Sequence, residues 1–219
     1  MTGSGSPKRI ALIIGSTRTP RIGPAVADFI ANCIVPGLSP GFSLTLIDLT
    51  SHPLPLYTED AILPASLPPP PQINLSAPPH GQGRTTGPYS DHRTNAWSSL
   101  IRKYHAFIFL TPQYNAGYPA CLKLALDALY WEWRGKPAVV MSYGMSHGGG
   151  TLAAAQLRQV LRHGLQMRVC QCSVGLAFGR GHRVGDGKLG RETAERWVKE
   201  GKPGELIQAV GELVGMLDE

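Results

Sequence analysis

The feature that most constrains the fold is a regular alternation of short apolar segments with segments of helical periodicity. Residues 8–14 read KRIALII, a nearly continuous apolar run that ends at Gly15. Such runs are typical of strands buried on both faces of a parallel sheet. Residues 23–35 follow with apolar side chains at helical spacing, and Pro36-Gly37 ends them. This stretch therefore predicts one strand followed by one helix.

The same alternation continues to the end of the chain. Further strands are expected at residues 42–49, 105–110, 136–142 and 167–172, and further helices at 94–103, 118–130, 148–163, 191–200 and 204–217. Five successive strand-then-helix units favour a parallel sheet with right-handed crossovers and helices on both faces. A length of 219 residues is ordinary for one compact domain, so we expect a single domain over residues 1–219.

A proline-rich segment interrupts this pattern after the second predicted strand. Ten of the 19 prolines lie between Pro53 and Pro88, including a run of four at residues 68–71. Proline lacks a backbone donor and fixes its φ angle, so it excludes long helices and central strands. We expect residues 61–87 to be an insertion that forms a mobile loop, and a solvated loop is favoured over a polyproline ligand for a partner.

Composition excludes several classes of protein. Hydrophobic residues make up 42% and charged residues 16%, which is typical of a globular chain. No apolar run approaches the roughly 20 residues that span a bilayer, and residues 1–7 lack the apolar stretch of a secretory signal. We therefore expect a cytoplasmic protein with no membrane partner. The four cysteines form no CxxC pair and have no suitably spaced histidine, so no metal site is expected.

Positive charge is concentrated near the N-terminus. The net charge is +6, and Lys8, Arg9, Arg18 and Arg21 all precede Asp28, the first acidic residue. A surplus of this size is common in soluble enzymes, and we expect no nucleic-acid partner. The concentration of positive charge beside the first strand instead indicates a place for a small anion.

Ligands of open α/β sheets bind outside the carboxyl ends of the strands, so the loops after the first, third and fourth strands are the candidates. The first, GSTRTPRIG at residues 15–23, joins a strand to a helix N-terminus and contains hydroxyls and guanidinium groups suited to a phosphate. An ordinary solvated turn is the alternative. The second, TPQYNAGYP at 111–119, offers aromatic rings and amides, and the third, SYGMSHGGG at 142–150, allows close backbone approach.

Three segments closely resemble the NADPH-dependent FMN reductase family, which also contains small quinone, azo and chromate reductases. They are GSTRTPRIGPAVADFI at residues 15–30, TPQYNAGYPACLKLALDALYWEWRGKPA at 111–138, and the loop at 142–150. The resemblance covers most of the chain except the proline-rich segment and the last stretch. It implies a flavodoxin-like three-layer sandwich with a five-stranded parallel sheet in the order 2-1-3-4-5.

The resemblance also implies a cofactor site. Carried onto this sequence, the FMN phosphate would be held by Ser16, Arg18, Arg21, Ile22 and Gly23. The isoalloxazine ring would be lined by Pro112, Gln113, Tyr114 and Asn115, and its pyrimidine side met by Ser142, Gly144, Gly148 and Gly149. Gln113 stands where relatives often carry Glu, and His105 where an acidic residue commonly begins the strand, so the electrostatics near the ring are expected to differ. The basic loop at 178–183 is expected to be solvated surface, with contact to an NADPH phosphate as the alternative.

The family's activity implies a hydride transfer from NADPH or NADH to N5 of FMN, and then reduction of a quinone or similar small acceptor. The cofactor carries this chemistry, so we expect no catalytic acid or base. Three alternatives remain: FMN as a diffusing substrate that leaves reduced, a non-catalytic flavodoxin-type electron carrier, or a flavin-binding sensor or scaffold without turnover whose proline-rich insertion is the partner site. The family is usually homodimeric, which makes Leu122, Leu126, Trp131 and Trp133 expected contact residues, although helical spacing assigns the leucines to the core equally well.

Overall fold

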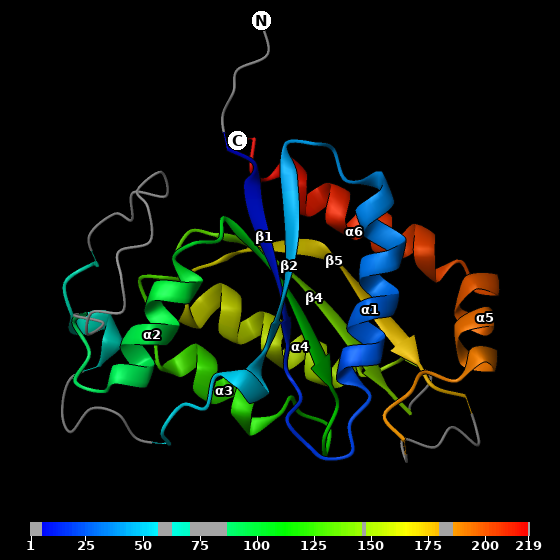
Figure 1. The fold of residues 1–219 in the computed structure, drawn as a ribbon, viewed down its shortest axis with the longest axis horizontal. Helices are drawn as coiled ribbons and strands as arrows, with labels where there is room; N and C mark the ends of the chain where they lie inside the picture. The colour runs from blue at the N-terminus through cyan, green and yellow to red at the C-terminus, as the bar shows by residue number, and fades with distance from the viewer. Residues whose placement is uncertain (1–5, 57–62, 71–86, 146–147, 180–185, 219) are drawn as a thin grey trace, which may run out of the picture.

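The structure, a computed structural model, describes residues 6–56, 63–70, 87–145, 148–179 and 186–218. Over these residues the chain forms one five-stranded parallel sheet in the order β2-β1-β3-β4-β5 (Figure 1). The strands are β1 (Lys8–Ile14), β2 (Phe42–Asp48), β3 (Ala106–Pro112), β4 (Pro137–Gly144) and β5 (Arg168–Ala177). The predicted parallel sheet and its strand order are confirmed.

Helices cover both faces of this sheet (Figure 1). They are α1 (Gly23–Ile34), α2 (His92–Ile101), α3 (Ala120–Asp127), α4 (Thr151–Gln159), α5 (Arg191–Lys199) and α6 (Lys202–Gly215). Short 3-10 turns lie at η1 (Val35–Gly37), η2 (Leu49–Ser51) and η3 (Pro64–Ser66), and a π-helical turn, η4 (Val160–Gly164), follows α4. Helices α1, α5 and α6 pack on one face, and α2, α3 and α4 on the other.

The burial of β1 explains why residues 10–14 are all apolar. Ile10, Leu12 and Ile14 belong to the hydrophobic cluster shared with α1 and α6, whereas Ala11 and Ile13 belong to the cluster on the opposite face. Successive side chains of a strand point to opposite faces, so a strand in the middle of a three-layer fold feeds two cores. The two cores together fix β1 as a central strand and place its carboxyl end beside those of its neighbours.

Two elements differ from their predicted bounds for identifiable reasons. Strand β5 runs through Gly175 to Ala177, five residues beyond its predicted end at 172. A Cβ atom at Gly175 would lie 2.1 Å from the carbonyl oxygen of Gly148, so this glycine permits close backbone approach and does not end the strand. Helix α3 ends at Asp127, and the carbonyl of Leu126 accepts there from the N–H of Leu129 at 3.3 Å and from the indole of Trp133 at 3.2 Å.

The expected dimer contacts are largely core residues. Leu122, Leu126 and Trp133 have no exposed surface within a single chain, so the interpretation of these three as contact residues is wrong, and the core alternative given for the two leucines is confirmed. The fourth, Trp131, donates its indole N–H to the carbonyl of Leu67 at 2.8 Å. Leu67 comes from the proline-rich segment, of which 63–70 and Gly87 are described; the predicted mobility of 61–87 concerns mostly residues outside the described ranges.

Within the described ranges, no helix is long and apolar enough to cross a bilayer. No group of three or more His, Cys, Asp or Glu side chains in that same part of the chain is arranged to hold a metal ion. The basic loop expected at 178–183 lies outside the described residues from position 180 onward.

Candidate functional site

The three candidate loops meet at the carboxyl edge of the sheet, because β1, β3 and β4 are consecutive neighbours. The N–H of Gly15 donates to the carbonyl of Leu110 at 2.8 Å, and the N–H of Gln113 donates to the carbonyl of Tyr143 at 3.2 Å. The first bond joins the first loop to β3 one residue before the second loop, and the second bond joins the second loop to the third. The structure therefore brings together the residues that the family resemblance assigns to one site.

The loop at residues 15–23 presents unused backbone donors. Helix α1 begins at Gly23 with Ile22 as its N-cap, and it has no side-chain cap and no acidic residue in its first turn. Within the described part of the chain, the backbone N–H groups of residues 17–19, 21 and 22 donate to no protein acceptor. Pro20, between them, has no N–H group. Free donors at a positive helix end favour an anion.

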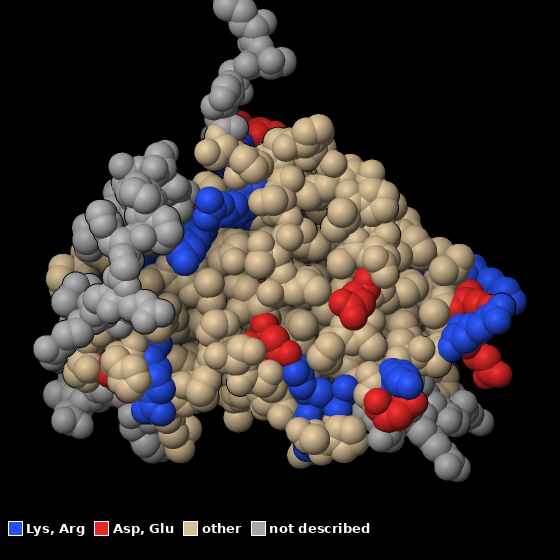
Figure 2. All heavy atoms as spheres, viewed as in Figure 1, with Lys and Arg blue, Asp and Glu red and all other residues tan. Residues whose placement is uncertain are grey.

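Positively charged side chains lie at the edge of the molecule where this loop is found. On the face seen in Figure 2, Lys and Arg atoms gather at the lower edge, where Figure 1 draws the loop between β1 and α1. Asp or Glu atoms border them near the end of β2. The loop thus presents a cationic surface bordered by acidic side chains (Figure 2).

Gly23 permits a close contact that no other residue would allow. A Cβ atom there would lie 2.2 Å from Oγ of Ser16 and 2.9 Å from the hydroxyl of Tyr143. Ser16 is 1% exposed and Tyr143 is 4% exposed. Burial raises the pKa of Tyr143 above its ordinary value, and the neighbouring Ser16 hydroxyl opposes only part of that shift. The three residues form a closely packed, uncharged floor under the loop.

Arg18 carries a charge that no carboxylate neutralises among the described residues. Its guanidinium carbon lies 4.0 Å from the centre of the Tyr114 ring, which is a cation–aromatic contact. Burial raises the pKa of Tyr114, and the positive charge of Arg18 opposes this shift. Arg18 is exposed, so its charge is available to an anion bound in the loop.

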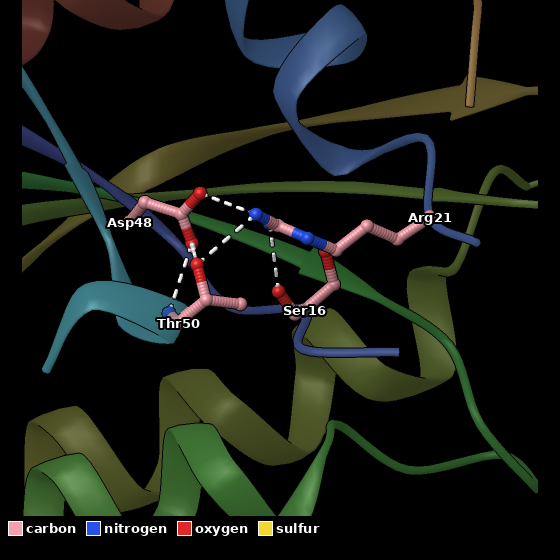
Figure 3. A network of polar contacts seen from close by, with 4 residues as sticks. All are labelled: Ser16, Arg21, Asp48 and Thr50. Atoms are coloured by element: carbon pink, nitrogen blue, oxygen red, sulfur yellow. Dashed lines mark hydrogen bonds and ion pairs between the residues drawn. The ribbon is translucent and has the colours of Figure 1, made fainter. Parts of the chain in front are cut away.

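Arg21 is placed differently, as Figure 3 shows. One terminal nitrogen forms an ion pair with Asp48 Oδ2 and donates to Thr50 Oγ1 at 3.2 Å. The other donates to the carbonyl of Ser16 at 3.0 Å. The guanidinium is therefore used by protein acceptors, and direct contact of Arg21 with a phosphate stays a prediction. Sequence reasoning missed Asp48 and Thr50, although an acidic residue at the end of a second strand was a usable signal.

The second loop forms a tight turn across Tyr114 and Gly117, which exchange backbone hydrogen bonds of 2.8 and 2.9 Å. The two central residues, Asn115 and Ala116, have φ angles of +48° and +65°. Positive φ at both centres is the pattern of type I′ turns, and at non-glycine residues it costs free energy. The turn holds the Tyr114 ring and the exposed Asn115 at the edge where Arg18 lies.

Gln113 and Pro112 connect the second loop to the third. Pro112 is buried, and Oε1 of Gln113 accepts from the backbone N–H groups of Leu152 and Ala153 at 3.2 and 3.4 Å. The Gln113 side chain therefore caps the N-terminus of α4. His105, the other departure from the family pattern, precedes β3 at the opposite edge of the sheet, where its Nδ1 accepts from the N–H of Arg9 at 2.9 Å. His105 therefore lies away from the three loops that the resemblance assigns to the flavin, and its effect on the electrostatics near the ring stays a prediction.

The third loop approaches the sheet closely and leads into α4. Gly149 and Gly150 have φ angles of +58° and +89°, and α4 starts after Gly150 without an acidic residue in its first turn. Ser142 has a buried hydroxyl with no hydrogen-bond partner among the described residues. Gly144 and Gly148 flank the turn, while positions 146 and 147 lie outside the described ranges. The loop presents a positive helix end and small residues to its surroundings.

Comparisons with known proteins agree with this geometry. The sequence model of the NADPH-dependent FMN reductase family matches residues 8–181. An NAD(P)H-dependent FMN reductase of a Nectria species is 31% identical over 215 residues, which cover 96% of this chain and 98% of the relative. The NAD(P)H-dependent FMN reductase LOT6 of Saccharomyces cerevisiae is 36% identical over 165 residues, with 74% and 76% covered. A quinone reductase of Pseudomonas putida is 32% identical over 157 residues, with 69% and 68% covered.

Among solved structures, the flavoenzyme NAD(P)H:(acceptor) oxidoreductase FerB of Paracoccus denitrificans superposes with a TM-score of 0.60 at 20% identity. The match covers 93% of this chain and 97% of FerB. At that identity the likeness shows the fold alone. Together with the strand order, it makes the fold flavodoxin-like, as the sequence predicts.

Proposed function

Because the chain belongs to the NADPH-dependent FMN reductase family and is an oxidoreductase, we propose that it holds FMN across the three loops at the carboxyl edge of the sheet. FMN would take a hydride from NADPH or NADH at N5 and pass electrons to a quinone or similar small acceptor. The protein's own residues bind the cofactor, orient it and exclude water.

The loop at residues 15–23 is the observation that carries the proposal. Its unused N–H groups, the helix end without an acidic residue and the unneutralised charge of Arg18 fit a phosphate dianion. Ser16, Ile22 and Gly23 shape the loop and let the backbone approach the ligand.

The other two loops fit a flat, partly polar ring. Pro112, Tyr114 and Asn115 supply an apolar edge with an aromatic face and an amide, while Gln113 fixes their position relative to α4. Ser142, Gly144, Gly148 and Gly149 would meet the pyrimidine side of the ring beside the N-terminus of α4. A positive helix end suits the electron-rich edge of a flavin.

The tyrosines near the site do not suit acid–base catalysis. Burial raises the pKa of Tyr118 to about 12, and the charge of Asp127 adds to the shift. The pKa of Tyr143 is also raised by burial. A general acid works best with a pKa near the working pH. We therefore propose that no side chain acts as catalytic acid or base.

We further propose a cytoplasmic homodimer. Met145 and Leu152 are each 58% exposed beside the third loop, and apolar side chains at that place suit cover by a second subunit. All four cysteines are free thiols, which is typical of a reducing compartment. Sedimentation of the purified protein tests the oligomeric state: a dimer is expected, and a monomer at micromolar concentration would contradict it.

The cofactor site is tested by titrating the purified protein with FMN and, in parallel, with riboflavin, which lacks the phosphate. We expect FMN to bind tighter than riboflavin. Equal affinity would remove the phosphate loop from the proposal, and absence of flavin binding would remove the site.

The reaction is tested anaerobically by adding NADPH or NADH to the FMN-loaded protein and then adding a quinone. Bleaching of the bound flavin by the nucleotide, followed by recovery with the quinone, is the expected result. Release of reduced FMN into the filtrate would instead establish flavin as a diffusing substrate. Failure of both nucleotides to bleach the flavin would leave only the electron-carrier function.

A further inference from the structure

We infer that Asp48 is a positioning residue for the FMN phosphate, which acts by anchoring Arg21 and thereby the loop at residues 15–23, while Arg18 supplies the charge in contact with the phosphate. The inference rests on the proposed function and gives the two arginines of the loop different roles. It assigns Arg21 a role in shaping the site, and it adds Asp48 of β2, which lies outside the three segments that carry the family resemblance.

The strand register places Asp48 beside the start of the loop. Asp48 is the last residue of β2, and it pairs with Ile14, the last residue of β1. The phosphate loop begins immediately after Ile14. A side chain at position 48 therefore lies at the base of the loop, and Figure 3 shows it facing the guanidinium of Arg21.

Asp48 is itself held in one orientation. Its Oδ1 accepts from the N–H of Thr50 at 3.0 Å and from the hydroxyl of Thr50 at 2.8 Å, which leaves Oδ2 for Arg21. Burial raises the pKa of Asp48, but the bonds from Arg21 and Thr50 outweigh it and leave the pKa below its ordinary value. Asp48 is therefore ionised at neutral pH.

Arg21 transmits this anchor to the loop backbone. From the Asp48 ion pair its guanidinium reaches the carbonyl of Ser16 at 3.0 Å, so it closes a ring from position 21 back to position 16. The backbone of Arg21 is also confined, because a Cβ at Gly187 would lie 2.9 Å from its carbonyl oxygen. With the Ser16 carbonyl fixed by Arg21, the following N–H groups keep one orientation.

The accessibility of the two arginines supports the division of roles. The Arg21 side chain is 18% exposed and its ion-pair partner Asp48 is 28% exposed. Arg18 is exposed. Among the ion pairs and cation–aromatic contacts of the described residues, its guanidinium takes part only in the contact with the Tyr114 ring. An incoming phosphate can bind Arg18 without competing with a carboxylate among the described residues, whereas the Arg21 guanidinium already gives three of its five N–H donors to Asp48, Thr50 and the Ser16 carbonyl.

The decisive variant is Asp48→Asn, which removes the charge that holds Arg21 but keeps an oxygen for Thr50. We expect the dissociation constant for FMN to rise roughly tenfold, a loss of about 1.4 kcal/mol, while that for riboflavin stays within twofold. Asp28→Asn is the matched control, because it removes the same charge from an exposed position on α1. Its affinity for FMN should equal that of the wild type.

A double-variant cycle tests the route through Arg21. Asp48→Asn and Arg21→Gln should together weaken FMN binding no more than either alone, because both break one anchor. Asp48→Asn combined with Arg18→Gln should be additive, because Arg18 contacts the ligand directly.

The outcomes separate this inference from the proposed function. Equal losses of FMN and riboflavin affinity in Asp48→Asn would show general damage to the fold, and tighter FMN binding would show that Asp48 withholds Arg21 from the phosphate. Unchanged affinity would show that the ion pair has no role. Each of these three results overturns the inference about Asp48 and leaves the proposed function standing. If the wild type does not prefer FMN over riboflavin, the phosphate site itself is wrong.

Discussion

Arg18 and Tyr114 join two loops that are nearly a hundred positions apart in sequence, through a guanidinium 4.0 Å from the ring centre. One residue belongs to the loop proposed to bind phosphate and the other to the loop proposed to line the flavin ring. The charge of Arg18 is held near the site before any ligand arrives, so little side-chain freedom is lost on binding.

Replacing Arg18 by glutamine should weaken FMN binding about 10- to 100-fold, because hydrogen bonds to charged groups contribute about 1.5–3 kcal/mol. Riboflavin binding should hardly change. Fluorescence titration with both flavins at two salt concentrations is the measurement. Arg191→Gln is the control, since its side chain is 91% exposed on α5, and an equal effect of the two substitutions would contradict a specific role.

Gly23→Ala should impair both folding and flavin binding. The added methyl would overlap Ser16 Oγ and crowd the Tyr143 hydroxyl, and overpacking of this kind costs about 1–3 kcal/mol. Urea unfolding and FMN titration measure the two effects. Gly211→Ala in α6, where a Cβ meets nothing within 4 Å, should instead be neutral or slightly stabilising. Tolerance of alanine at position 23 would show that the floor under the loop is not closely packed.

The turn at Asn115 predicts opposite responses to two substitutions. Asn115→Gly should retain stability, because glycine accepts the observed φ of +48°. Asn115→Val should lower the free energy of unfolding by about 1–3 kcal/mol, since β-branched residues are strained at positive φ. Thermal unfolding checks both. Equal stability of the two variants would mean that the turn relaxes freely.

Lys136 predicts a pH dependence of stability. Burial lowers its pKa from 10.5 to about 8, although the charge of Glu132 opposes the shift, and its ammonium group donates to the carbonyl of Ile101 at 3.2 Å. Below pH 8 both the folded and the unfolded chain carry the proton, so the cost of burying the charge is fully present. Between pH 8 and 10.5 the unfolded chain keeps a proton that the folded chain has lost, so this cost is relieved as pH rises.

The free energy of unfolding of the wild type, minus that of Lys136→Met, should therefore increase by up to about 3 kcal/mol from pH 7 to pH 10.5. Comparison with the variant cancels the titration of tyrosines and cysteines, which both proteins share. Urea unfolding across this range gives the difference, and a value independent of pH would show that Lys136 is effectively solvated.

The fold was largely predictable because its strands lie in two cores. Residues 10–14 are apolar on both faces of the sheet, and β1 has the predicted bounds, Lys8–Ile14. The predicted bounds were wrong where contacts with distant parts of the chain accompany the end of a helix. Leu129 continues the helical period, yet α3 ends before it, where Trp133 from farther along the chain donates to the carbonyl of Leu126. Periodicity carries no information about such a cap.

The loops that form the candidate site were predictable from the sequence, but the hydrogen-bond and ion-pair partners of their side chains were not. The order of the loops located the phosphate and ring segments, since each follows a strand. The pairing of Arg21 with Asp48 depends on the register of β1 with β2 across 27 positions of sequence, and no local pattern encodes it. The capping of α4 by Gln113 was hidden for the same reason.

The close approach of Gly175 to the Gly148 carbonyl has a consequence for anyone who wishes to alter which acceptors the enzyme takes. The loop at residues 142–150, beside the proposed ring edge, packs directly on the backbone of the last strand. A change in the conformation of one segment therefore requires a change in the other. Diversifying residues 142–150 alone would search shapes that the neighbouring strand forbids. A library that varies both segments together explores the conformations that this scaffold can hold.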